Sequence, residues 1–317
     1  MNLRIGSRGS QLALWQANHI AALIRGQGHT VEIEIIKTTG DRLQEVTFAQ
    51  VGSKGMFTKE IEEALAEGRV DLAVHSLKDL PTELPEPFAL AATPPRVDPR
   101  DVLVSVKFGS IRELQQGARV GTSSQRRRAQ LKALRPDIEA VEFRGNVDTR
   151  LRKLAEGQVD AILLAAAGLD RLEKTDWVRE RLEPSAFCPA AGQGSLGIET
   201  RKGDIATIGA IAFLDDTDTR FAVTLERAAL AALGGGCQVP IGIHCRPELA
   251  QAAGGRPGLW NEIYAVVADP GTGAAIRIFH RAPRAGADAV ALGQLAARKL
   301  IEAGAGPLLE AAGGVGR

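Results

Sequence analysis

A seven-residue pattern occurs twice in this chain, at residues 65–71 (LAEGRVD) and at residues 154–160 (LAEGQVD). In both copies a helix would end at the glycine, which accepts the left-handed backbone common at helix ends, and an apolar strand would follow. Two copies of one helix–strand unit predict two related α/β lobes. Ligands of open α/β sheets bind at the loops that follow the strands. Chance recurrence of a common helix–glycine–strand pattern is the alternative explanation.

Apolar alternation and helix start signals divide most of the chain into short elements. Strands are predicted at residues 3–5, 31–35, 70–74, 102–106, 140–143 and 161–164, and near residues 263–267 and 275–278. Helices are predicted at residues 10–25, 57–66, 124–134, 147–155, 219–233 and 287–303. Residues 38–56 carry glycines and charges without periodicity, which indicates a mobile loop or lid. The alternation of strands and helices predicts α/β domains with mostly parallel sheets.

Two punctuated stretches suggest where the domains meet. Prolines cluster between residues 81 and 99, which indicates a boundary or hinge, and the glycine-rich turn at residues 189–199 fits a hinge that returns the chain to the first lobe. We therefore expect domain 1 at residues 1–95 plus 196–214, domain 2 at 100–190 and domain 3 at 217–317. The tail from residue 304 is rich in small residues and is expected to fray.

Composition excludes several classes of protein. The net charge of +1 and the aromatic content of 4% argue against a nucleic-acid binder, which needs a basic surface or stacking platforms. Three cysteines without a CxxC motif signal neither a disulfide framework nor a zinc site. No apolar run is long enough to span a bilayer, and the first residues do not lead into a secretory core. The cytoplasm is the expected compartment, and no metal is expected.

Arginines gather where predicted strands give way to helices. Residues 121–128 (GTSSQRRR) and 143–150 (FRGNVDTR) are two such turns, Arg8 lies at a third, and Arg171 follows a fourth strand. Cations in the first turn of a helix interact unfavourably with the helix dipole, and the binding of an anion there would compensate for this. Arginine pairs with carboxylates through its planar fork. The pattern predicts a cleft for several carboxylates or phosphates; a solvated basic helix face is the alternative for each turn taken alone.

Two other residues could carry chemistry. Asp79 is the carboxylate of the loop at residues 75–81 (HSLKDLP), and it could balance a cationic intermediate or pass a proton to a leaving amine. Its alternative role is to cap the turn before Pro81. Cys237 lies in residues 234–240 (GGGCQVP), where glycines leave room for a bulky group to approach the thiol. The alternative is a buried cysteine after a glycine-rich helix stop.

Taken together, these motifs resemble the porphobilinogen deaminase (hydroxymethylbilane synthase) family. The resemblance runs in order from residue 3 to about residue 242, and the remainder matches in layout. The motifs that carry it are Arg8 and Ser10 before LALW at residues 12–15, HSLKDLP at 75–81, GTSSQRR at 121–127, RGNV at 144–147, GQG at 192–194 and GCQVP at 236–240.

The resemblance implies a transferase of tetrapyrrole synthesis. It would join four porphobilinogen molecules head to tail with loss of ammonia and then release linear hydroxymethylbilane. The family holds a dipyrromethane primer through a thioether, here on Cys237, and uses an aspartate, here Asp79, to stabilise the cationic azafulvene and assist proton transfer. The implied primer-binding residues also include Ser76, Lys78, Thr122, Ser123, Ser124, Arg126, Arg127 and Arg150. The implied substrate-binding residues are Arg8, Ser10, Arg144, Arg150, Arg171 and Gln193, and the lid positions are Lys54, Phe57 and Lys59.

The resemblance also implies an architecture and partners. The family has three α/β domains; the first two resemble lobes of type II periplasmic binding proteins, and the third is a small α+β domain that carries the cofactor cysteine. It implies a monomer that binds porphobilinogen, no nucleic acid and no membrane, and that hands its product to uroporphyrinogen III synthase. The competing hypothesis is a two-lobed anion receptor in which Cys237 is incidental. The absent signal peptide, Asp79 among arginines and the thiol on a third domain favour the enzyme.

Overall fold

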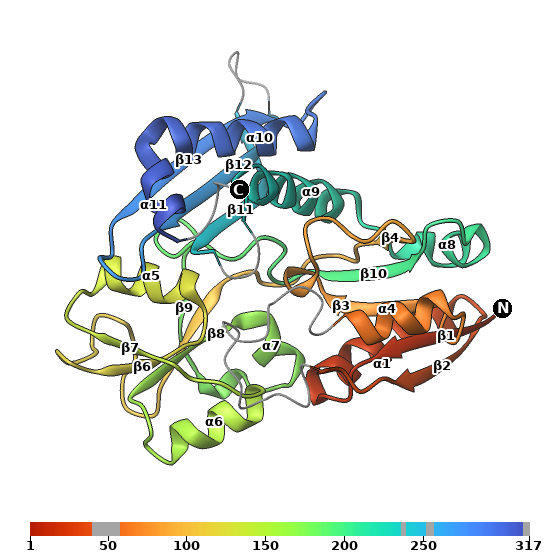
Figure 1. Ribbon diagram of the computed structural model, residues 1–317, viewed down its shortest axis with the longest axis horizontal. Coiled ribbons are helices and arrows are strands. Elements are labelled where there is room, and N and C mark those ends of the chain that lie inside the picture. The colour runs from red at the N-terminus through yellow and green to blue at the C-terminus, as the bar shows by residue number, and fades with distance from the viewer. Residues whose placement is uncertain (40–57, 236–238, 252–256, 313–317) are drawn as a thin grey trace.

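The strands of this protein form three separate sheets (Figure 1). The computed structural model describes residues 1–39, 58–235, 239–251 and 257–312. Two of the sheets have five strands and the third has three, within the described part of the chain. Each sheet is covered by helices, so the protein is a mixed α/β molecule, as the sequence predicts.

The first sheet has the strand order β2-β1-β3-β10-β4, and we call it with its helices lobe one. Its first three strands are parallel, and β10 runs antiparallel to both of its neighbours. The strands are β1 (Asn2–Ser7), β2 (Thr30–Ile35), β3 (Leu72–Ser76), β4 (Phe88–Ala92) and β10 (Leu196–Arg201). The helices are α1 (Gln11–Gly26), α4 (Lys59–Ala66), α8 (Ile205–Ile211) and the 3₁₀ turns η1 (Leu77–Asp79) and η3 (Ala212–Leu214).

The second sheet has the strand order β7-β6-β8-β5-β9, and we call it with its helices lobe two. Strand β6 is parallel to β7 and β8, while β5 is antiparallel to β8 and β9. The strands are β5 (Asp101–Val104), β6 (Arg119–Gly121), β7 (Glu139–Val141), β8 (Ala161–Ala165) and β9 (Val178–Leu182). The helices are α5 (Gln125–Leu134), α6 (Val147–Ala155), α7 (Ala166–Arg171) and the 3₁₀ turn η2 (Thr175–Trp177).

The two sheets match strand for strand, and this confirms the prediction of two related lobes. In each, the fourth strand in the order is the antiparallel one. The repeated heptapeptides lie before equivalent strands, β3 and β8. Their glycines, Gly68 and Gly157, have φ angles of 70° and 78°, the left-handed backbone that ends a helix. The recurrence is therefore structural and not a coincidence of composition.

The chain crosses between the lobes twice. The outward crossing (residues 93–100) joins β4 to β5, and the return crossing (residues 183–195) joins β9 to β10. The crossings touch at Gly194, whose φ is 88° and where a Cβ would come within 2.6 Å of the Val97 carbonyl oxygen. Only glycine allows two backbones to approach so closely. Each crossing delivers the antiparallel strand of the lobe that it enters.

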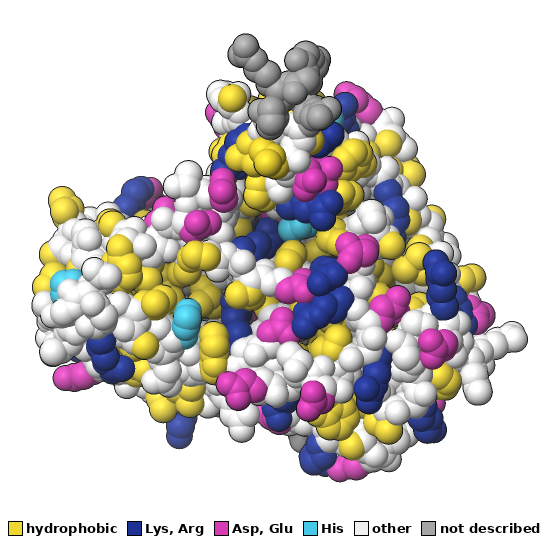
Figure 2. All heavy atoms as spheres, turned by 180° about the vertical axis from the view of Figure 1, so that it is seen from behind, with side chains coloured by type: hydrophobic (Ala, Val, Ile, Leu, Met, Phe, Trp, Pro, Cys, Tyr) yellow, Lys and Arg dark blue, Asp and Glu magenta, His cyan; other side chains and the backbone are white. Residues whose placement is uncertain are grey.

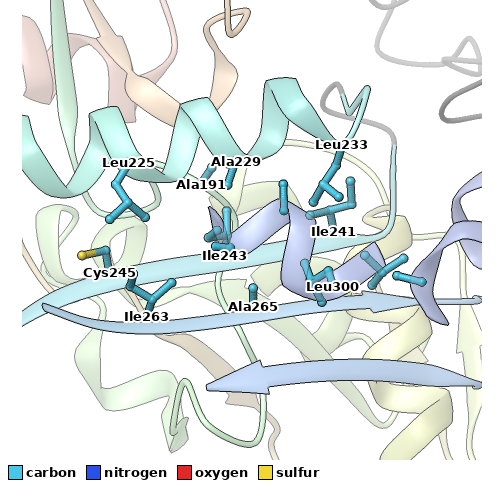
Figure 3. Packing of buried hydrophobic residues seen from close by; sticks show 14 of the residues in the cluster. Ala191, Leu225, Ala229, Leu233, Ile241, Ile243, Cys245, Ile263, Ala265 and Leu300 are labelled. Carbon is cyan, nitrogen blue, oxygen red and sulfur yellow. The ribbon is translucent and has the colours of Figure 1, made fainter. Parts of the chain in front are cut away.

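The third sheet consists of antiparallel strands covered on one face by helices. Its strands are β11 (Ile241–Gln251), β12 (Pro257–Ala268) and β13 (Ala275–Pro283). Its helices are α9 (Thr217–Ala232), α10 (Ala289–Leu300), the π-helical turn η4 (Ile301–Ala305) and α11 (Gly306–Ala311). Figure 3 shows Leu225 and Ala229 of α9 pointing toward Ile243 of β11 and the strand beyond it.

Two expectations for this third unit were wrong. Strand β11 was not predicted, and its first five residues, 241–245, are all buried instead of alternating between two faces. The tail from residue 304 was expected to fray, but α11 forms there and Leu309 is fully buried in the core of the third sheet. Burial of Leu309, with Ala305 buried and Leu308 packed beside it, holds this last described segment against the core, because apolar side chains are removed from water.

A buried carboxylate fastens the third sheet to the crossings. Glu226 of α9 is fully buried and pairs with Arg96 of the outward crossing at 2.6 Å. It also accepts hydrogen bonds from the backbone N–H groups of Gly192 (2.7 Å) and Cys245 (2.8 Å). Burial opposes ionisation, but the charge of Arg96 and the hydrogen bond and charge of His244 lower the pKa of Glu226 to about 2. The third unit is thereby held where the two lobes meet.

The domain boundaries at residues 95, 100, 190 and 214 stay predictions, although the strands on either side of them belong to different sheets. Within the ranges that the structure describes, no helix is both long and apolar enough to cross a lipid bilayer.

Candidate active site

A cleft of ≈ 630 Å³ lies between the two lobes. Its walls come from the loops after β1, β2 and β3 of lobe one and from the equivalent loops of lobe two. The return crossing supplies Gly192, Gly194 and Ser195. This volume lies in the range of small-molecule sites, and its position at the carboxyl ends of the parallel strands is where α/β sheets bind ligands.

Three of these loops are fixed by side chains that cap the following helix. Ser10 accepts a hydrogen bond from the Ala13 N–H at the start of α1. Ser124 and Asn146 do the same at the starts of α5 and α6. A capped first turn holds the preceding loop in one conformation. Each capped loop then presents its cationic side chains to the cleft at a defined place.

The cleft is lined mainly by cations. The lysines and arginines among its lining residues are Arg8, Lys37, Lys78, Arg127, Arg144, Arg150 and Arg171, whereas the lining acids are Asp79 and Asp148. Asp148 is engaged by Lys174, whose Nζ lies 2.8 Å from its carboxylate. The described walls of the cleft therefore carry a large excess of positive charge around Asp79.

Arg127 is buried with its neighbour Arg126 against one carboxylate. Asp101, the first residue of β5, is fully buried and lies 2.6 Å from Arg126 and 2.8 Å from Arg127. Burial opposes ionisation of Asp101, but the two guanidinium groups hold its pKa far below the usual range. Arg127 lines the cleft, whereas Arg126 does not, since its Nη1 also donates to the Cys188 carbonyl at 2.6 Å.

Arg150 and Arg171 have no carboxylate within ion-pair distance in the described part of the chain. Arg150 donates to the Gly145 carbonyl at 2.6 Å, and Arg171 donates to the Gly194 carbonyl at 2.9 Å. Burial lowers the pKa of each arginine to about 10. A desolvated cation that lacks a counter-charge is costly unless an anion joins it. Both arginines are therefore poised for an anionic ligand.

Lys78 and Asp79 occupy the turn after β3. The Lys78 Nζ donates to the Gln193 side chain at 3.3 Å. Burial and then the charge of Arg127 lower the pKa of Lys78 to about 8. Asp79 is exposed, and its carboxylate makes no hydrogen bond or ion pair with the described residues. The turn is closed instead by the backbone bond from Leu80 to Leu77, so the capping role for Asp79 is not supported.

The structure brings most of the predicted site residues to one place. The predicted residues that line the cleft are Arg8, Ser10, Ser76, Lys78, Asp79, Ser123, Arg127, Arg144, Arg150 and Arg171. Those that are described but do not line it are Thr122, Ser124, Arg126, Gln193 and Lys59. Lys54, Phe57 and Cys237 lie outside the described residues.

The residues that do not line the cleft have other contacts. Ser124 caps α5, and Thr122 accepts a hydrogen bond from the Ser124 N–H at 3.2 Å. Gln193 is buried behind Lys78. Lys59 is exposed at the start of α4 and lies 3.9 Å from Glu63. These positions fit support of the loops better than direct contact with a ligand in the cleft, and their binding roles stay predictions.

Two residues of the site were missed by the sequence analysis. Lys37 follows β2 and lines the cleft; the rule that found the arginines at strand ends would have found it if lysines had been included. Asp101 gave a weaker signal. An acid that opens an apolar strand, directly after a proline-rich crossing, is unusual because burial disfavours its charge.

The arrangement fits a ligand with several carboxylates. Lys78, Arg150 and Arg171 have depressed pKa values because they are desolvated beyond what the described anions compensate. A dipyrromethane bearing acetate and propionate groups would supply that missing negative charge. Arg150 and Arg171 are the side chains placed to hold such groups by paired hydrogen bonds, and Arg127, which already pairs with Asp101, adds positive charge to the wall.

The fold and the cleft together define a class: two-lobed α/β proteins with a third attached sheet that bind polyanions between the lobes. Comparison with known proteins defines the family. Residues 3–208 match the family model described as "Porphobilinogen deaminase, dipyromethane cofactor binding domain", and residues 220–302 match "Porphobilinogen deaminase, C-terminal domain". The chain belongs to the porphobilinogen deaminase family.

Two curated relatives carry the same family name. The chain is 55% identical over 244 residues to a porphobilinogen deaminase of Trichlorobacter lovleyi, covering 76% of this chain and 78% of the relative. It is 45% identical over 310 residues to one of Maridesulfovibrio salexigens, covering 97% of each. Among solved structures, it is similar to a periplasmic substrate-binding protein of an ABC transporter from Coxiella burnetii, with 13% identity and a TM-score of 0.43, over 69% of this chain and 94% of that one.

Proposed function

We propose that this protein is a hydroxymethylbilane synthase, which joins four porphobilinogen molecules on a covalent dipyrromethane primer and releases the linear tetrapyrrole. The observation that carries the proposal is the excess of positively charged side chains along the described walls of the cleft. Each porphobilinogen unit brings two carboxylates, so a growing chain needs many cations along its path. Family membership supplies the reaction to which this charge is suited.

The described cations would bind and orient the substrate. Arg127, Arg150 and Arg171 project from three different helices of lobe two, α5, α6 and α7, so they can attract carboxylates at separate places along one molecule. Lys78 adds a fourth cation from lobe one. Several fixed contacts orient the reacting atoms and exclude water from them. When bound, the dipyrromethane supplies the free pyrrole position to which each new unit is joined.

Asp79 would perform the proton chemistry. Its carboxylate is exposed and faces the positive field of Lys78, Arg127 and Arg150. It can accept a proton from a pyrrole nitrogen, return a proton to the amine that leaves as ammonia, and balance positive charge on the substrate. A carboxylate already tied to an arginine would do this less well. Asp79 forms no ion pair with the described residues, and this supports the role.

Cys237 is the proposed anchor of the primer. The chain has three cysteines, and the two that the structure describes are buried. Burial raises the pKa of Cys245 to about 12 and raises that of Cys188 further, so neither thiol is available as a thiolate. Cys237 lies outside the described residues, and its assignment follows from its motif and from the unsuitability of the other two.

Intact-protein mass spectrometry tests the proposal. The purified full-length protein should carry extra mass equal to two pyrrole units, and Cys237→Ser should lack that mass and be inactive. Cys188→Ser is the matched control, because a serine hydroxyl can replace the thiol that donates to the Tyr264 carbonyl, and it should keep the added mass. Active protein without added mass would refute the primer. A protein that binds porphobilinogen without turnover would be an anion receptor.

Several further properties belong to the same proposal. We infer a monomer in the cytoplasm, where the free thiols of Cys188 and Cys245 stay reduced. We infer no nucleic-acid partner, which is supported by the way Lys and Arg side chains alternate with Asp and Glu side chains across the face in Figure 2. Hand-over of the product to uroporphyrinogen III synthase is part of the proposal as well.

A further inference from the structure

Asp101 lies where the two crossings meet, and the reaction proposed above gives it no task. Its carboxylate is fully buried, so it does not touch the cleft. Burying a carboxylate is expensive, and the expense must be offset by specific contacts. Those contacts connect three separate segments of the chain to Lys78.

The Asp101 carboxylate accepts hydrogen bonds from three side chains. Its Oδ2 accepts from Arg126 Nη1 at 2.6 Å, and its Oδ1 accepts from Arg127 Nε at 2.9 Å. The third donor is Gln193 Nε2 of the return crossing, at 3.0 Å from Oδ1. One negative charge therefore faces two arginines of α5 and the amide of a residue from the other crossing.

Gln193 has only one orientation that satisfies its neighbours. Its Nε2 also donates to the Pro99 carbonyl at 2.8 Å. Both groups at this end, Pro99 and Asp101, are acceptors, so a flipped amide would place oxygen against oxygen. The Oε1 end must then face Lys78, and it accepts from Lys78 Nζ at 3.3 Å. Asp101 thus sets the orientation of Gln193, and Gln193 gives Lys78 an acceptor.

The charges around Lys78 make this support necessary. Among the described residues, the charged groups that act on it most are Arg127 and Arg126, which disfavour its ammonium form, and Asp79 and Asp101, which favour it. Asp79 is exposed to solvent, so its attraction is screened. Asp101 is fully buried and therefore acts through a less polar medium.

We propose that Asp101 and Gln193 are positioning residues that keep Lys78 charged and aimed into the cleft, next to Asp79. This rests on the proposed function only in that Lys78 binds a carboxylate of the substrate. We call the contacts from Asp101 through Gln193 to Lys78 the relay. It starts at the first residue of β5 and runs through the return crossing to the turn after β3. The crossing point between the lobes is in this way connected to a cation of the binding site.

The relay can be tested without measuring turnover. The purified full-length protein is pulse-labelled with acetic anhydride across a pH series, and acetylation of Lys78 is followed by peptide mass spectrometry. Only the neutral amine reacts, so the pH midpoint reports the Lys78 pKa, which lies at about 8 in the parent protein. Asp101→Asn should lower the midpoint by about one unit, because an opposing charge is removed. Gln193→Met keeps the side-chain length, removes only the amide, and should lower the midpoint by about half a unit.

Asp98→Asn is the matched control. Asp98 lies on the outward crossing, shortly before Asp101, but it pairs with Arg100 and Arg181 and does not line the cleft. The pH midpoint of Lys78 acetylation in Asp98→Asn should equal that in the parent protein. If Asp101→Asn does not fold, Gln193→Met decides, because it leaves Asp101 paired with both arginines.

Turnover is measured in parallel at pH 8. Each relay variant should raise the KM for porphobilinogen more than it lowers kcat, since Lys78 binds and does not react. An unchanged Lys78 midpoint in a folded relay variant would overturn the relay even if the protein is an active synthase. A parent protein that lacks primer and turnover would overturn the proposed function, whatever the midpoints show.

Discussion

In lobe one the heptapeptide ends at Asp71, and in lobe two it ends at Asp160. Each carboxylate accepts a hydrogen bond from the backbone N–H of the neighbouring first strand, Arg4 in β1 and Arg119 in β6, at 2.8 Å in both cases. The backbone N–H groups of the two aspartates return bonds to the same residues' carbonyls at 2.8 and 2.9 Å. We call the strands and helices of each lobe, without the loops after the strands, its frame. The frames of the two lobes thus agree down to single hydrogen bonds.

The lobes differ at the other ends of the same strands. Strand β3 continues into a 3₁₀ turn that carries Lys78 and Asp79, whereas β8 continues into α7, which carries Arg171. Lobe two supplies arginines to the cleft, and its acid Asp148 is paired with Lys174. Lobe one supplies the carboxylate that is exposed. Backbone bonds and apolar faces fix the frame, and the loops after the strands are where the lobes can differ in chemistry.

The largest expected effect tests whether proton chemistry belongs to lobe one alone. Asp79→Asn should keep the fold and the covalent primer, since Asp79 is exposed and supports no described contact, but should lower kcat by about 10²–10⁴-fold. Asp148→Asn, the matched change in lobe two, should lower it by less than about tenfold. Steady-state kinetics on the loaded enzyme measure both. Similar losses in the two variants would show that the lobes share the proton chemistry.

A second experiment tests whether binding is the main task of lobe two. Arg150→Ala removes a desolvated arginine from the cleft wall and should raise the KM for porphobilinogen by about 10–100-fold, the effect of one charged hydrogen-bonding group. Arg152→Ala, on the same helix, removes a mostly exposed arginine that pairs with Glu156, and it should leave KM unchanged. An unchanged KM for Arg150→Ala would mean that the charge excess of lobe two does not bind substrate.

The sequence predicts the frame because the frame rests on local signals. Ser10, Ser124 and Asn146 stand directly before helices, at the position of an N-cap. Gly68 and Gly157 each follow the end of a helix with a left-handed backbone. The cationic loops follow from the same boundaries, since each lies directly after a predicted strand. Most of the predicted cleft residues were therefore within reach of pattern and chemistry.

The connections between distant segments were not predictable in this way. Asp101 meets Gln193 and, through Gln193, Lys78 only because two crossings of the chain touch. Glu226 likewise meets Arg96 only when α9 packs onto the crossings. No periodicity or spacing encodes such long-range pairs. Strand β11 was missed because neighbouring strands, and not its own residues, decide how it pairs.

The smallest expected effect is on the stability of the two lobes, and it compares the equivalent residues Asp71 and Asp160. Asp71 also pairs with the Arg4 side chain at 2.9 Å and lies 3.5 Å from Arg201, whereas Asp160 forms no ion pair with the described residues. Asp71→Asn should therefore destabilise lobe one by about 1–2 kcal/mol, and Asp160→Asn should destabilise lobe two by about 1 kcal/mol or less. Hydrogen exchange of the amides in β1 and β6 measures each lobe separately.

The pH dependence makes this last comparison decisive. Burial opposes the shift, but hydrogen bonds and charge from Arg4 hold the pKa of Asp71 below its usual range. Stability from a depressed carboxylate pKa is fully present above the unfolded value of about 3.9 and is lost as the pH falls through the folded value. The difference in the stability of lobe one between the parent protein and Asp71→Asn should therefore shrink below a pH of about 4. A difference that persists there would assign the effect to the shape of the side chain, and equal effects in the two lobes would show that the Arg4 pair adds nothing to the shared backbone bonds.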